Sequence, residues 1–190
     1  SFALSGFLIA VHCKLDILGV FISAFLTAFG GGMTRDVLAD RTPYVFTSNL
    51  PLSLVIATVL IAMLFKLHKI TNLEGKWAFV ISDAIGLSSF AITGAIIAIE
   101  SDFNFLSAVM LAFITAVGGG TIRDVLINRM PFILVSEFYA TVALIIGSVV
   151  YILDAFELRN IFSLIIVFIF GVVLRVLAYY KKWHLPTLSK

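Results

Sequence analysis

The chain has 190 residues, of which 61% are hydrophobic and 13% charged; its net charge is +2 and its mean hydropathy is +1.13. Soluble domains are about half apolar and about a quarter charged, so this composition excludes an ordinary water-soluble domain and predicts a surface that faces lipid. The small net charge argues against nucleic acid as a partner, and a single cysteine, Cys13, excludes an internal disulfide.

Six apolar stretches predict helices that cross a bilayer, which takes about 20 mostly apolar residues for each helix. In chain order they are residues 15–40, 50–65, 78–99, 105–128, 132–153 and 161–180. Residues 1–11 are apolar as well but too short to span. We count them as the end of a further helix, so the sequence predicts an all-α membrane protein with seven transmembrane helices.

Basic residues in the connections predict the orientation, because Lys and Arg in short loops favour the cytoplasm. With seven spans, the basic residues that share one side are Lys14, Lys66, Lys69, Lys76, Arg129, Lys181 and Lys182. The opposite loops are richer in acidic residues, among them Glu100, Asp102, Asp154 and Glu157. We therefore expect the N-terminus outside and the C-terminus in the cytoplasm.

The chain contains an internal repeat, the feature to look for first in any sequence. Residues 1–46 match residues 89–134 at a constant offset of 88, and FLTAFGGGMTRDVLADRTP pairs with FITAVGGGTIRDVLINRMP. An odd number of helices in each copy inverts the second copy, which is an architecture of transport proteins. We expect a three-helix repeat over 1–66, whose first helix begins upstream of Ser1, an inverted repeat over 78–153 and a seventh helix over 159–182.

A glycine triplet lies near the middle of one apolar stretch in each repeat. The two triplets are Gly30, Gly31 and Gly32, then Gly118, Gly119 and Gly120. Three glycines cost a helix on the order of 3 kcal/mol relative to alanine, which predicts that both helices break or kink there. A break in lipid favours a hydrated cavity, and the carbonyl end of a half-helix suits cations. Close helix packing is the alternative reading of small residues.

A polar stripe runs through each triplet at steps of four residues. Its members are Ser23, Thr27, Gly31 and Arg35 in the first copy, and Thr115, Gly119 and Arg123 in the second. A second stripe of small residues runs beside it and ends in Asp36 or Asp124. We expect the hydroxyl groups of the polar stripe to line a pore.

The two Arg-Asp pairs follow the triplets inside apolar stretches. Intramembrane charges are expensive and are by default a functional hypothesis. We expect Arg35 and Arg123 to set the field of a pore or to gate it while paired with Asp36 and Asp124. The alternative is a structural set in which the two pairs join across the repeats.

Other chemistry has little support in the sequence. Asp83 is more consistent with a solvated or capping residue, and Arg175, about one turn from the membrane boundary, with a snorkelling side chain. Histidines at metal-ligand spacing are absent, as are nucleophile, phosphate-loop and zinc motifs. The sequence therefore predicts no enzyme, no catalytic residue, no metal site and no cofactor.

The doubled motif, GGGMTRDVL and GGGTIRDVL, resembles the prokaryotic branch of the trimeric intracellular cation channel family, also described as bacterial glycine transporters. The resemblance covers essentially the whole chain. It implies a homotrimer in a prokaryotic inner membrane, surrounded by lipid, with a pore for potassium, sodium and other monovalent cations in each protomer and kinks at both triplets. Animal members bind a phosphoinositide at Lys-Glu-Val, where this chain has Arg123, Asp124 and Val125. The different geometry removes that expectation, while an ordinary phospholipid could bind there.

Two functions of different classes fit these features. The leading hypothesis is a monovalent cation channel. The alternative is a transporter of glycine or a similar zwitterion, in which an arginine binds the carboxylate and an aspartate the ammonium group. Inverted repeats and broken helices serve both. A non-transporting membrane scaffold is the third reading, and intramembrane charges argue against it.

Overall fold

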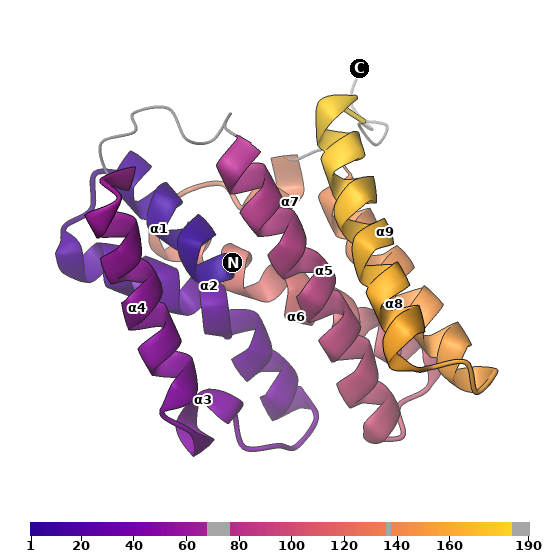
Figure 1. Ribbon diagram of the computed structural model, residues 1–190. Helices are drawn as coiled ribbons and strands as arrows, with labels where there is room; N and C mark the ends of the chain where they lie inside the picture. The colour runs from indigo at the N-terminus through magenta and orange to yellow at the C-terminus, as the bar shows by residue number, and fades with distance from the viewer. Residues whose placement is uncertain (68–76, 136–137, 184–190) are drawn as a thin grey trace.

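The computed structural model describes residues 1–67, 77–135 and 138–183, and every regular element within those residues is a helix (Figure 1). In chain order the elements are α1 (Phe2–His12), α2 (Ile17–Leu38), α3 (Tyr44–Thr47), α4 (Leu50–Leu64), α5 (Trp77–Glu100), α6 (Phe105–Leu126), α7 (Phe132–Val135), α8 (Tyr139–Ala155) and α9 (Ile161–Tyr180). The elements α3 and α7 are single turns of four residues. The predicted all-α class is confirmed.

The 88-residue offset of the sequence returns in the bounds of the helices. Both ends of α6 lie 88 residues beyond those of α2, and the same holds for α7 and α3. The helix starts are alike as well. Asp16 Oδ1 accepts a hydrogen bond from the Gly19 amide at 2.7 Å, and Asn104 Oδ1 accepts one from the Ser107 amide at 3.0 Å. Each side chain satisfies an amide that the first turn leaves unpaired.

Within the described residues, four helices, α2, α5, α6 and α9, are long and apolar enough to cross a membrane. The apolar helices α1, α4 and α8 are shorter, with 11, 15 and 17 residues. Large apolar side chains cover the outer surface, and on α9 Phe162 is 75% exposed and Ile166 67%. Lipid rather than water suits such a surface, so the chain is a helical membrane protein. The count of seven transmembrane helices stays a prediction.

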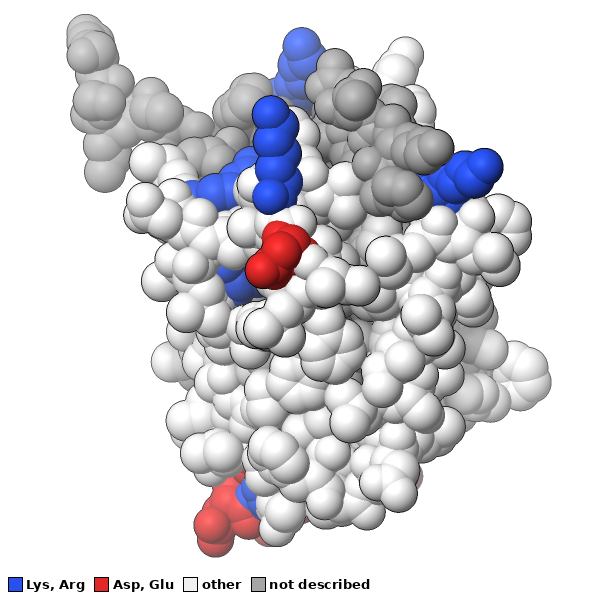
Figure 2. Space-filling model, turned by 90° about the vertical axis from the view of Figure 1, so that its left-hand side faces the viewer, with Lys and Arg blue, Asp and Glu red and all other residues white. Residues whose placement is uncertain are grey.

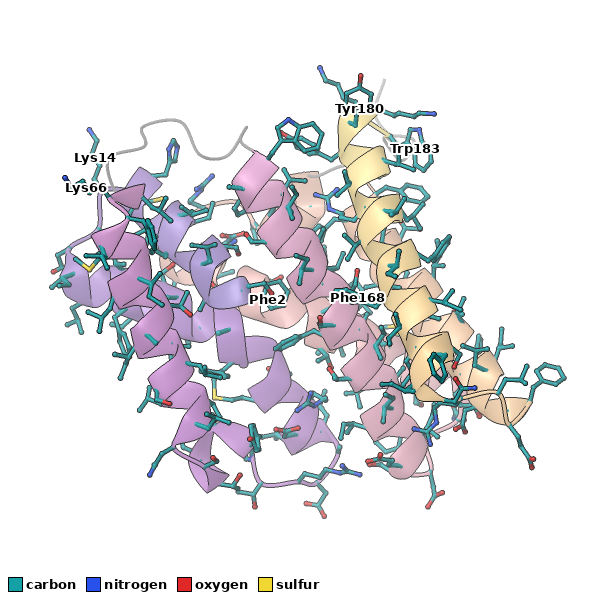
Figure 3. All side chains as sticks on the ribbon, viewed as in Figure 1. Phe2, Lys14, Lys66, Phe168, Tyr180 and Trp183 are labelled. Carbon is teal, nitrogen blue, oxygen red and sulfur yellow. The ribbon has the colours of Figure 1, made fainter. Side chains whose placement is uncertain are left out.

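Charged residues gather mostly toward the two ends of the helices, and the broad face between them is uncharged (Figure 2). Lys14, Lys66 and Tyr180 all lie at the end that carries the C-terminus (Figure 3). At this end the Trp77 ring packs against the rings of Tyr179 and Tyr180, as in the aromatic belt of a membrane interface. The shared end of Lys14 and Lys66 agrees with the predicted topology, and its assignment to the cytoplasm stays a prediction.

The helices α2 and α6 form the centre of the molecule. They pack on each other, α1 packs on α2, and α5 packs on α6. One buried apolar cluster joins α1, α2 and α4 to the start of α5, and a second joins α5, α6 and α8. Both glycine triplets therefore lie where the two halves of the chain meet.

Candidate functional site

The glycine triplets form a crossing at which the backbones of α2 and α6 touch. A β-carbon built on Gly31 would lie 2.0 Å from the Thr115 carbonyl oxygen, and one built on Gly119 would lie 2.3 Å from the Thr27 carbonyl oxygen. No side chain fits at either position. Because Gly31 meets Thr115 while Thr27 meets Gly119, the two helices are antiparallel at this crossing.

The predicted breaks are not confirmed, because α2 runs from Ile17 to Leu38 and α6 from Phe105 to Leu126 as uninterrupted helices through the glycines. Close packing explains how each helix tolerates a triplet. The free-energy cost of the glycines to each helix is offset by helix–helix contacts that only glycine permits. A bend within the continuous helix stays a prediction.

The third glycine of each triplet differs from the second. A β-carbon built on Gly32 would meet nothing nearer than an Arg35 Nη at 3.8 Å, and on Gly120 nothing nearer than an Arg123 Nη at 3.7 Å. These glycines therefore leave room beside the arginines, whereas the second glycines bring the helices together.

The hydroxyl groups of the polar stripe are buried and engaged. Ser23 Oγ donates to the Gly6 carbonyl at 2.8 Å, Thr27 Oγ1 to Ser23 at 2.6 Å, and Thr115 Oγ1 to Leu111 at 2.6 Å. Thr27 and Thr115 thus bond within their own helices. Ser23 also lines a cavity of about 280 Å³ together with Arg123.

Each Arg-Asp motif is a closed local unit. In the first, Arg35 Nε donates to Asp36 Oδ1 at 2.8 Å, and Asp36 Oδ2 accepts from the Tyr44 amide at 3.0 Å. In the second, Arg123 Nε donates to Asp124 Oδ1 at 2.8 Å, and Asp124 Oδ2 accepts from Phe132 at 2.9 Å. One aspartate oxygen holds the arginine. The other fixes the one-turn helix that follows the motif.

The expected pairing of arginine with the adjacent aspartate is what the structure contains. The alternative, a set that joins both motifs across the repeats, is wrong. Arg35 lies four residues beyond Gly31 and Arg123 four beyond Gly119, so the antiparallel crossing puts the two motifs on opposite sides of the contact.

Each motif opens on a cavity. The Arg35 cavity, of about 180 Å³, is lined by Ala28, Phe29, Gly32, Met33, Arg35, Asp36, Tyr44, Val45, Phe90 and Thr93. The Arg123 cavity, of about 160 Å³, is lined by Ile9, Phe79, Arg123, Asp124, Arg129, Met130 and Phe132. The α2–α6 crossing separates them. The candidate site is thus two charged cavities with a tight helix contact between them.

Sequence reasoning missed a polar cluster next to the Arg123 cavity. Arg175 does not snorkel: it is 1% exposed, and its guanidinium lies 4.8 Å from the Tyr139 ring centroid and 5.8 Å from that of Phe132. Asp83 is neither solvated nor a cap, being 5% exposed. Its carboxylate accepts a hydrogen bond from the Tyr139 hydroxyl. In the sequence, Asp83 and Arg175 each appear as a charge inside an apolar stretch. The sequence does not show that the two lie in one cluster.

Comparison with known proteins covers most of the chain. A family model described as glycine transporter matches residues 1–67 and 80–155. The membrane protein YvgT of Bacillus subtilis is 36% identical over all of this chain and 92% of its own length. The inner membrane protein YadS of Escherichia coli is 41% identical over 79% of this chain and 72% of its own length.

Solved structures are similar to this chain as well. A structure described as a basis for conductance through TRIC cation channels is 38% identical with a TM-score of 0.87, and covers 100% of this chain and 92% of its own. A prokaryotic TRIC channel crystallised in 0.5 M KCl is 34% identical with a TM-score of 0.86, over 97% and 92% of the two chains. The doubled glycine and Arg-Asp motif, the matched family model and these structures together place the chain in the glycine transporter family of membrane proteins, the family of the prokaryotic TRIC channels.

Proposed function

We propose that this protein is a channel for monovalent cations, potassium and sodium among them, with one path through each chain. The observation that carries the proposal is the pair of charged cavities, one on each side of the α2–α6 crossing. The similarity to solved cation channels supports it. In this function the Arg35 and Arg123 cavities are the two vestibules, and the crossing is the constriction between them.

The chemistry of the motifs fits a cation path. An unpaired arginine would repel a cation, but each arginine here is neutralised by its neighbour at 2.6 to 2.8 Å. Water and ions can therefore enter a vestibule without meeting an uncompensated positive charge. Gly32 and Gly120, which leave space beside the guanidinium groups, widen the vestibules where the charges lie.

Opening requires movement at the crossing, because Gly31 and Gly119 press against carbonyl groups of the facing helix. We assign the hinge to the six glycines, Gly30, Gly31, Gly32, Gly118, Gly119 and Gly120. A change of bend there separates α2 from α6 and exposes the helix carbonyls and the hydroxyl groups of Ser23, Thr27 and Thr115 to a partly hydrated ion.

The proposal includes the wider organisation predicted from the sequence. It comprises seven transmembrane helices in two inverted repeats, over 1–66 and 78–153, plus a helix over 159–182. It also comprises a homotrimer in a prokaryotic inner membrane, an outside N-terminus and a cytoplasmic C-terminus. No cofactor or catalytic step is part of it, and a phospholipid bound near Arg123 is compatible with it.

A carrier for glycine or a similar zwitterion is the second candidate. The matched family model is described as glycine transporter, and Arg35 and Asp36 present opposite charges to one cavity of about 180 Å³. In such a carrier the arginine binds the carboxylate and the aspartate the ammonium group. The mutual pairing of the two side chains at 2.6 Å weighs against it, because a substrate would have to break that pair.

Planar-bilayer recording of purified protein separates the two. We expect ohmic unitary currents in potassium chloride that vanish when an impermeant organic cation replaces potassium. Liposomes of the same preparation, loaded with labelled glycine, provide the second arm. Saturable glycine exchange without unitary currents would overturn the channel and favour the carrier.

A further inference from the structure

The Arg123 cavity differs from the Arg35 cavity in having further buried charges around it. Asp83 on α5 and Arg175 on α9 are 5% and 1% exposed, and Tyr139 on α8 is 6% exposed. Phe79, one helical turn before Asp83 on α5, lines the Arg123 cavity. The cluster thus adjoins the vestibule, and the start of α5 lies toward the end of the molecule that carries the C-terminus (Figure 1).

The four buried charges in and next to the lining of this vestibule, Arg123, Arg175, Asp83 and Asp124, balance. A further arginine of the lining, Arg129, is only partly buried. Asp124 neutralises Arg123 through a contact of 2.8 Å. Asp83 interacts electrostatically with both Arg175 and Arg123. Without Asp83 the cluster would carry one uncompensated positive charge at low dielectric, where a unit charge acts strongly over several ångströms.

Two polar atoms of this cluster have bonding capacity left over. Among the described residues, Asp83 Oδ2 and Arg123 Nη1 are buried and have no hydrogen-bond partner. A buried polar atom without a partner is costly, and it is satisfied by water or by a bound solute where a polar cavity adjoins it. Asp83 itself does not line the cavity, so its carboxylate acts on a solute in the vestibule through its electrostatic field.

We propose that Asp83 is a specificity-determining residue of this channel, whose carboxylate offsets Arg175 next to the paired Arg123 and makes the Arg123 cavity favour cations over anions. The inference rests on the proposed function. The Tyr139 ring, 4.8 Å from the Arg175 guanidinium, holds this second positive charge in place. Selectivity would accordingly depend on one vestibule more than on the other.

The test measures the reversal potential of purified protein in planar bilayers under a potassium chloride gradient. We expect Asp83→Asn to lower the permeability of potassium relative to chloride by on the order of tenfold. Asp83→Glu, which keeps the charge, should retain the wild-type ratio. Asp16→Asn is the matched control, because it neutralises an exposed aspartate near Lys14 at the same end and should leave the ratio unchanged.

A compensating double variant separates an electrostatic role of Asp83 from a role in folding. Adding Arg175→Gln to Asp83→Asn restores the charge balance, so the double variant should recover most of the wild-type ratio. It also carries the test if Asp83→Asn alone does not yield folded protein. An unchanged ratio in Asp83→Asn, or a loss that Arg175→Gln does not recover, would overturn the role of Asp83. Absence of current in the wild-type protein would instead overturn the channel itself.

Discussion

The two Arg-Asp motifs are alike in their hydrogen bonds and different in their surroundings. Both aspartates hold an arginine with one oxygen and the amide of a one-turn helix with the other. The Arg35 side chain is 14% exposed, whereas that of Arg123 is 3% exposed and lies near further buried charges. Sequence neighbours set the hydrogen bonds, so duplication copied them. The electrostatic field around each motif depends on how distant helices pack, so the two halves could diverge in their surrounding charges.

The largest effect is expected from a substitution that breaks the more buried Arg-Asp motif. Asp124→Ala leaves the Arg123 guanidinium buried without its carboxylate and the Phe132 amide without an acceptor. Removing one partner of a buried pair costs about 3–5 kcal/mol. Asp36→Ala removes the same contacts where water reaches the arginine, so its loss should be smaller. Thermal midpoints of both variants in one detergent measure the difference, and equal losses would show that burial does not distinguish the motifs.

The second comparison is between neighbouring glycines of one triplet. Gly31→Ala forces a methyl group into the Thr115 carbonyl oxygen, and overpacking of this kind costs about 1–3 kcal/mol or more. Gly32→Ala is the matched control, because its nearest neighbours, the Arg35 tip and the Phe90 ring, both lie at an ordinary contact distance of 3.8 Å and alanine favours the helix. Thermal midpoints should therefore fall for Gly31→Ala and stay level or rise for Gly32→Ala. A similar fall in both would mean that the triplet acts through flexibility rather than contact.

The current through the channel tests the pairing itself. Asp36→Asn and Asp124→Asn keep an acceptor for the following amide but free a positive charge in each vestibule. We expect each to reduce the unitary potassium current, by about tenfold if the uncovered charge raises the barrier by about 1.4 kcal/mol. Single-channel recording measures the change. Unchanged current in both variants would contradict a role for the pairs in conduction.

The features that could be predicted from the sequence are those set by local patterns. The repeat, the helical class and the Arg-Asp pairing follow from periodicity and from adjacent residues. The continuity of α2 through Gly31 does not follow, because propensity alone opposes three glycines and the compensating contact with Thr115 joins residues far apart in the chain. Propensity is a weak prior wherever tertiary contacts oppose it.

The burial of Asp83 and Arg175 was unpredictable for the same reason. Each residue, viewed alone, lies near a helix end where a charged group can reach water. Only the packing of α8 and α9 against α5 encloses them. A charge in an apolar stretch identifies a candidate, while its partner and its depth depend on the fold.

The smallest effects test how far the likeness of the two halves extends. Asp16 caps α2 and Asn104 caps α6 through the same amide position. Replacing either by alanine should cost about 1 kcal/mol, and Asp16→Ala should cost slightly more, because a negative charge at a helix start adds a few tenths of a kcal/mol. Asp16→Asn removes the charge and keeps the cap, so its thermal midpoint isolates that difference. If Asp16→Asn is as unstable as Asp16→Ala, the charge rather than the hydrogen bond holds the start of α2. The two halves would then differ in what stabilises the starts of α2 and α6, as well as in the charges around their Arg-Asp motifs.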